Sequence, residues 1–147
     1  MRGPEILRED NQNDVNCGMQ DRPATSELSD AVREFLETEI LPSLPDARLK
    51  FRVLVAMNAL GMISREANLE ETHLHAEFSS LNALLGFDAP VPERFSSLQA
   101  MTMQMNTIFS NQIRAGNLPD GTFDHLERVT KAKLAVSNPG YLKRYAE

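Results

Sequence analysis

Hydrophobic positions along the chain recur at the spacing of helices. Their intervals of three and four residues place apolar side chains on one helix face, and no segment alternates with period two for long enough to predict a strand. Proline and glycine separate the stripes. The predicted helices span residues 25–41, 47–68, 70–85, 96–115 and 122–137. The pattern therefore predicts an all-α fold, an antiparallel bundle of about five helices.

The most apolar stretch covers residues 51–66 in the second predicted helix, where Asn58 is the one polar side chain between positions 53 and 63. One face of its helical wheel can pack on the protein's own core; this face contains Leu49, Val53, Ala56, Leu60 and Ile63. The roughly opposite face contains Phe51, Leu54, Asn58, Met62 and Arg65. This second face needs either more of the same chain or a partner. Gly61 predicts the close approach of a neighbouring helix, because an interior glycine otherwise costs helix stability.

Residues 1–21 differ from the rest in composition. They contain two basic and five acidic side chains and few large apolar groups. Such a segment buries too little surface to offset the entropy of ordering. We expect a flexible, disordered N-terminal tail, followed by a single helical domain over residues 22–147.

Charge and cysteine content exclude several classes of protein. The net charge is −6, whereas a nucleic-acid binder is normally basic. Cys17 is the single cysteine, which rules out an intramolecular disulfide or a cysteine-based metal site. No apolar run approaches the ~20 residues of a membrane span, and the N-terminus lacks the apolar core of a signal peptide. We expect a cytoplasmic protein with no nucleic acid and no membrane among its partners.

No catalytic motif appears in the sequence. His73 and His75 are two residues apart and so do not share a helix face, and the segment 120–124 lacks the ligand pattern of a calcium loop. Glycine-rich phosphate loops and nucleophile elbows are absent, although a Ser/His/Asp set assembled by the fold stays open. We therefore expect no catalytic residues, no metal and no cofactor, and a protein that is not an enzyme.

Four polar positions have two interpretations each. Lys133 stands in an apolar stripe, so either its stem packs while its ammonium reaches solvent, or it holds an anionic group at an interface. The amide of Asn58 either forms its hydrogen bonds inside the bundle or contacts a partner protein. Arg65 lies on the same face, and it either forms an internal ion pair or contacts the same partner. Arg114 lies in the last turn of its helix, where the helix dipole already favours a cation. Residues 128–144 add five basic side chains and no acid, a local positive end.

Several blocks in one order resemble a known family. They are RP at 22–23, SEL at 26–28, AVREFL at 31–36, LP at 41–42, F-x-V-x-V-A-x-N-A-L at 51–60, RE at 65–66, LNALLG at 81–86, I-R-A-G at 113–116 and K-L-A-V-x-N-P-x-Y at 133–141. The family comprises small bacterial all-helical proteins of unknown function, encoded beside aminoglycoside-phosphotransferase-like kinases and often acyl-CoA dehydrogenases. The levulinate-catabolism accessory protein B looks like a member, and there the neighbouring kinase phosphorylates a 4-hydroxyacyl-CoA.

The resemblance implies a non-catalytic accessory subunit of a hydroxyacyl-CoA kinase. It carries over no catalytic residue, because the family offers none. The candidate contacts to the kinase, or to acyl-CoA through the complex, are Phe51, Leu54, Asn58, Met62, Arg65, Arg114, Lys133 and Asn138. Two alternatives stay open. One is an independent acyl-CoA or small-acid binding module, and the other is a homodimer that buries the second face of the central helix on itself.

Overall fold

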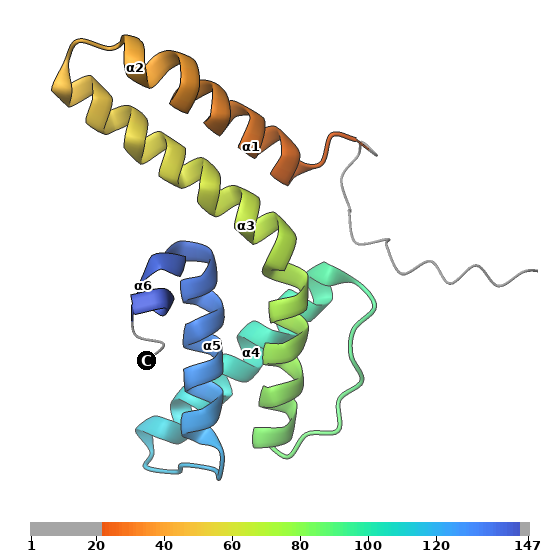
Figure 1. The fold of residues 1–147 in the computed structure, drawn as a ribbon. Coiled ribbons are helices and arrows are strands. Elements are labelled where there is room, and N and C mark those ends of the chain that lie inside the picture. Colours follow the sequence, from red (N-terminus) through yellow and green to blue (C-terminus); the bar gives the residue numbers. More distant parts are fainter. Residues whose placement is uncertain (1–21, 145–147) are drawn as a thin grey trace, which may run out of the picture.

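The computed structural model describes residues 22–144, and this part of the chain is helical without a strand (Figure 1). The all-α class and the count of about five helices are confirmed. The predicted flexible tail, residues 1–21, lies outside the described residues. The elements are α1 (Thr25–Phe35), η1 (Leu36–Ile40), α2 (Leu41–Ser43), α3 (Ala47–Leu84), α4 (Phe95–Arg114), α5 (Thr122–Ser137) and α6 (Pro139–Arg144).

The sequence predicts Thr25 or Ser26 as the N-cap of the first helix, but Ala24 takes this position. Ala24 precedes the helix, and its N–H donates to the Glu27 carboxylate at 2.8 Å. The sequence predicted that Pro42 and Pro45 end this segment. The helical backbone runs through a turn of π-helix, η1, and past Pro42 to Ser43. Leu44 then adopts the extended conformation that the following Pro45 favours, so Pro45 is the effective breaker.

The longest helix corrects the prediction of two separate helices over 47–68 and 70–85. The Oδ1 of Asp46 accepts from the Arg48 N–H at 2.9 Å and caps α3, which then continues for 38 residues to Leu84. No proline and no glycine other than Gly61 interrupts this stretch. The helix ends where expected, before Gly86 with its φ of 67°.

Two parts of the molecule share α3 (Figure 1). The segment from α1 to α2 folds back along the first half of α3, making a two-helix hairpin that projects as an arm. The second half of α3 packs on α4 and α5, and α6 folds over the end of α5. Gly61 is buried beside α1. A Cβ there would lie 3.1 Å from Nη1 of Arg65 in α3 itself and 3.9 Å from the Arg33 side chain of α1, so the tightest contact comes from the same helix and not from the neighbouring helix that the sequence predicted.

The buried apolar core lies entirely in the body formed by α3 and α4. Its fully buried members are Phe78, Leu81, Leu98, Met105 and Phe109. No large apolar side chain of the arm reaches the same burial among the described residues. The contact between the two helices of the hairpin therefore fully buries no large apolar side chain, and several of its apolar side chains stay exposed to solvent.

Candidate functional site

A groove of about 400 Å³ lies between α3 and α5. Its volume is that of a small-ligand pocket. The lining residues are Met62, Glu66, Glu70, His73, Leu74, Ala76, Glu77, Ser80, His125, Arg128, Val129, Ala132, Lys133, Val136 and Ser137. The two helices run antiparallel, so the carboxylates of α3 face the cations of α5 across an apolar floor.

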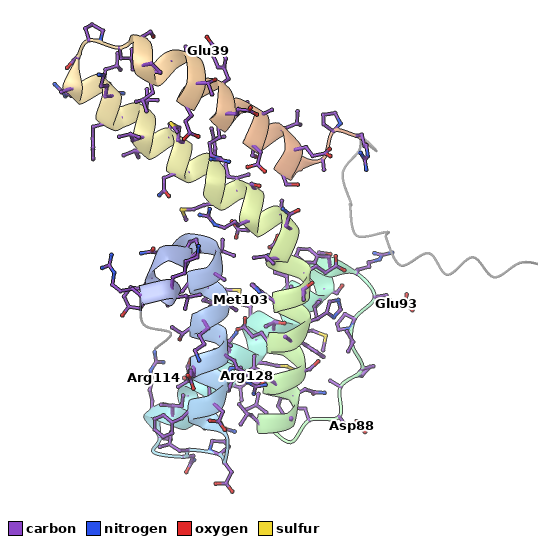
Figure 2. All side chains as sticks on the ribbon, viewed as in Figure 1. Glu39, Asp88, Glu93, Met103, Arg114 and Arg128 are labelled. Atoms are coloured by element: carbon purple, nitrogen blue, oxygen red, sulfur yellow. The ribbon has the colours of Figure 1, made fainter. Side chains whose placement is uncertain are left out.

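One end of the groove carries a polar network built by both helices. The Oγ of Ser80 lies 2.8 Å from Nδ1 of His125, and Arg128 donates from Nη2 to the same oxygen at 3.0 Å. The Arg128 Nε also donates to the Asp124 carbonyl oxygen. Figure 2 shows Arg128 between α3 and α5. These contacts fix a serine hydroxyl, an imidazole and a guanidinium together.

The imidazole of His125 is the most buried titratable group in the groove. It is 1% exposed, and its ring meets Phe109 edge-to-face with 5.3 Å between centroids. Burial lowers the pKa of His125 below 6.5; Glu77 acts in the opposite direction, and the cations Arg128 and Lys133 lower this pKa further. The ring is thus held neutral near pH 7 and can donate or accept one hydrogen bond at each nitrogen.

This arrangement is suited to binding, because a guanidinium beside a neutral imidazole can hold an anionic or polar ligand group. Glu77 accepts a hydrogen bond from Asn106 Nδ2 at 2.7 Å, which ties it to α4.

Within residues 22–144 no cluster of three or more His, Cys, Asp or Glu side chains could hold a metal ion. No described helix has the length and apolarity needed to cross a membrane.

Sequence patterns missed this network. Ser80, His125 and Arg128 are separated by 45 and 48 positions, so only the antiparallel packing of α3 and α5 brings them together. The open possibility of a set assembled by the fold was the nearest prediction. The signal that could have pointed to it is the apolar face of residues 122–137, on which His125 interrupts the stripe.

Three of the predicted contact residues lie in a crease between α1 and α3. Leu54, Asn58 and Arg65 line it beside Asp30, Arg33 and Glu37 of α1. Asn58 is exposed, so it is not the satisfied internal amide that one interpretation favoured. Arg65 is half-buried and donates from Nε to the Val136 carbonyl oxygen at 2.7 Å, which favours an internal role. Of the five residues on the second face of the central helix, these three therefore line the crease, and the other two lie outside it.

The remaining two apolar members of that face differ from each other. Phe51 is 66% exposed near the tip of the hairpin, and Leu54 beside it is 48% exposed. Met62 is half-buried and forms the upper end of the α3–α5 groove. The expected excess of apolar surface is thus present around Phe51 and Leu54, while Met62 belongs to the groove.

The three remaining candidates are dispersed. Lys133 is exposed at the rim of the groove, and no described residue forms an ion pair with it. Arg114 does not line the groove; it contacts Asn111 at 3.4 Å in the last turn of α4 (Figure 2). Asn138 accepts from the Tyr141 N–H at 3.2 Å and so caps α6, a structural role that explains its place in the chain.

The face expected to pack on the core is also left partly open. Leu49 and Ile63 of α3 are 40% and 46% exposed, because α1 covers only the edge of this face. On α1, Leu28, Val32 and Phe35 follow at helical spacing and are each about half exposed. The arm therefore presents exposed apolar side chains on more than one side.

Comparison with known proteins assigns the chain to a family. A family model for a domain of unknown function matches residues 42–141, from α2 into α6, and leaves α1 outside the match. Searches of curated proteins and of solved structures gave no match. The matched stretch contains all of α3 and the groove, so these features belong to the domain itself. The chain is a member of the DUF6285 family, whose domain has no assigned function.

Proposed function

We propose that this protein is a non-catalytic accessory subunit that binds an aminoglycoside-phosphotransferase-like kinase acting on hydroxyacyl-CoA. The observation that carries the proposal is the arm, whose apolar side chains are exposed although the rest of the molecule has a packed core. The family resemblance supplies the identity of the partner. The absence of a recognisable catalytic motif in the sequence agrees with a supporting role.

The proposed contact surface is centred on Phe51 and Leu54, with Asn58 beside them. Two apolar side chains and an exposed amide form a small anchor of the kind that dominates protein interfaces. Both apolar side chains lose water on binding, and because each is already partly buried, each adds about 1–2 kcal/mol before the costs of association. The hairpin tip is the most distant part from the body, so it can enter a partner's cleft.

The mechanism that fits this geometry is preorganisation. Binding of the arm would order the acyl-CoA site of the kinase before substrate arrives, which lowers the entropy that substrate binding must offset. The cationic rim of α5, with Arg128 and Lys133, would then lie near the phosphates of the acyl-CoA or nucleotide. No group of this chain takes part in the phosphoryl transfer.

Co-expression with the adjacent kinase tests the proposal. We expect the two proteins to co-purify and the kinase to gain activity toward hydroxyacyl-CoA. Phe51→Asp should abolish both effects, because it places a charge at the centre of the contact. Phe123→Asp is the matched control, since Phe123 is 76% exposed at the start of α5, away from the arm.

Two results would reject the accessory role. One is a kinase whose kinetics are the same with and without this protein and that does not co-purify with it. The other is a complex that Phe51→Asp and Phe123→Asp weaken equally, because then the arm is not the contact.

A second candidate function is favoured by the groove: an independent binding module for a small organic acid or its acyl-CoA. The Ser80–His125–Arg128 end would hold the carboxylate or thioester oxygen, and the apolar floor would hold the acyl chain. Calorimetry on the isolated protein with short-chain carboxylates and their CoA esters tests it. Binding that Arg128→Gln weakens and Arg114→Gln leaves unchanged would support this function; no heat with any of these ligands would reject it.

A further inference from the structure

One line of residues along the exposed side of α3 has the spacing of a coiled-coil seam. Intervals of three and four alternate without a break, which keeps all seven positions on one stripe. The stripe, named the α3 seam, consists of Leu49, Arg52, Ala56, Ala59, Ile63, Glu66 and Glu70. It is basic at one end, small and apolar in the middle, and acidic at the other end.

Most of the α3 seam is left uncovered by the described part of the chain, residues 22–144. Six of its seven residues are exposed, and Glu70 is half-buried. Arg52, Glu66 and Glu70 form no ion pair or hydrogen bond with any residue of the described part of the chain. A row of apolar and charged side chains at seam spacing, open along its length, is suited to another helix.

The order of charges selects the occupant. We propose that the α3 seam pairs antiparallel with the same seam of a second copy, on a two-fold axis at Ala59. In an antiparallel pair, the residue numbers of two facing residues always add up to the same value, which is twice 59 for an axis at Ala59. Arg52 of each copy therefore meets Glu66 of the other. The two Ala59 side chains face each other, and Ile63 of each copy meets Val55 of the other, a residue that borders the seam. The charged positions Arg52 and Glu66 are thus complementary to themselves about the axis, as an isologous interface requires.

The small residues at the centre permit close approach. Ala56 and Ala59 carry only a methyl group each, so two backbones can come near one another at the axis. The ion pairs lie on either side and occur twice each by symmetry. An antiparallel direction is specified because a parallel pair would oppose Arg52 to Arg52 and Glu66 to Glu66.

The seam is separate from the surface around Phe51 and Leu54, and it shares only Glu66 and Glu70 with the groove. Phe51 and Leu54 lie on another side of α3, and the groove with α5 starts about a quarter turn away, at Met62 and His73. Glu66 and Glu70 form the shared rim. The core made with α4 begins at Leu74, beyond the end of the seam. The dimer therefore goes beyond the proposed kinase contact and does not depend on it.

Charge exchange on the purified full-length protein tests the pairing. Sedimentation velocity should show a dimer for the wild type. Arg52→Glu and Glu66→Arg should each raise the dimer dissociation constant about tenfold or more, because each replaces two attractions by two repulsions. The double variant should restore the wild-type value. Lys50→Glu, the same charge change at an exposed position outside the seam, should have little effect.

Cross-linking tests the axis itself. In a Cys17→Ser background, Ala59→Cys should form a covalent dimer with a short bis-maleimide, and Ala100→Cys on α4 should not. Adding Arg52→Glu should suppress the cross-link. A protein that is monomeric at every concentration tested would overturn the proposal, as would a dimer that neither charge variant weakens. Kinase binding that survives these variants would leave the proposed function intact.

Discussion

At the scale of single residues, Arg65 joins two parts of the structure. Its Nε donates to the carbonyl oxygen of Val136 at 2.7 Å, in the last turn of α5. A cation there both satisfies a terminal carbonyl and complements the helix dipole. The side chain therefore fastens α5 to the point where the arm begins.

Arg65→Ala should lower the free energy of unfolding by about 1.5 kcal/mol, the scale of a hydrogen bond to a charged group. Urea unfolding followed by circular dichroism measures the change. Arg114→Ala is the control, because Arg114 is exposed and contacts only Asn111 in its own helix. An equal loss in both variants would contradict the role given to Arg65.

The buried imidazole gives the stability a defined pH dependence. Burial lowers the pKa of His125 below its unfolded value of 6.5, so below that pH the unfolded chain binds more protons than the folded one. Stability from this group is complete above 6.5 and falls as the pH drops from 6.5 toward the lowered pKa.

We expect thermal scans to show a smaller loss of stability between pH 7 and pH 5 in His125→Asn than in the wild type. The asparagine amide can replace Nδ1 at Ser80 while removing the titration, although the smaller side chain lowers stability at every pH. His75→Asn is the control, since His75 is only half-buried on α3. Parallel pH profiles for His125→Asn and the wild type would contradict the prediction.

Residue types indicated some of these positions and not others. Asn58, Arg65 and Lys133 were detectable because a polar side chain in an apolar stripe is conspicuous along one helix. Which of them was satisfied internally depended on a carbonyl at position 136, outside the range of local patterns. Ser80 and Arg128 look like ordinary surface residues of separate helices, and only tertiary packing makes them neighbours.

At the scale of elements, the continuity of α3 decides the architecture. Two helices were expected over 47–68 and 70–85, each with its own apolar stripe. A change of face does not break a helix, and the absence of proline or glycine between positions 62 and 85 lets hydrogen bonding continue. The positions of proline and glycine were therefore better evidence for where a helix ends than the pattern of apolar residues.

Asn68→Pro should separate the arm from the body. A proline in a helix interior costs about 3 kcal/mol or more, and here it lies at the junction of the two parts. Circular dichroism should show lost helicity and urea unfolding a lowered midpoint. Asn68→Ala should instead raise stability by a few tenths of a kcal/mol, since the position is exposed and alanine favours helix. Tolerance of the proline would show that the two halves do not need a continuous helix.

At the scale of the whole molecule, the core and the arm differ in how far their apolar side chains are buried from solvent. The fully buried apolar side chains lie in α3 and α4 of the body, and each adds about 1.5–3 kcal/mol. The arm has exposed apolar faces and a single layer of contact. Sequence patterning predicted the class and most helix ends, because these depend on local residues. It did not predict the division into arm and body, because that depends on which faces meet.

Hydrogen exchange should report this difference. Amides of α1 and of the first three turns of α3 should exchange faster than those around Phe78 and Leu81, because local opening of the arm exposes little buried surface. Their protection should rise with protein concentration or with added kinase, whichever partner covers them. Uniform protection in a dilute sample would contradict the arm-and-body description.

The unbroken length of α3 has a mechanical consequence. The tip of the arm lies about 30 Å along the helix from Asn68, given a rise of ~1.5 Å per residue. A bend of only about 10° at that point would carry the tip sideways by about 5 Å, as a rod swings about a pivot. Small strains in the body, such as those from filling the groove beside His73, would reach whatever the tip touches as a displacement many times larger.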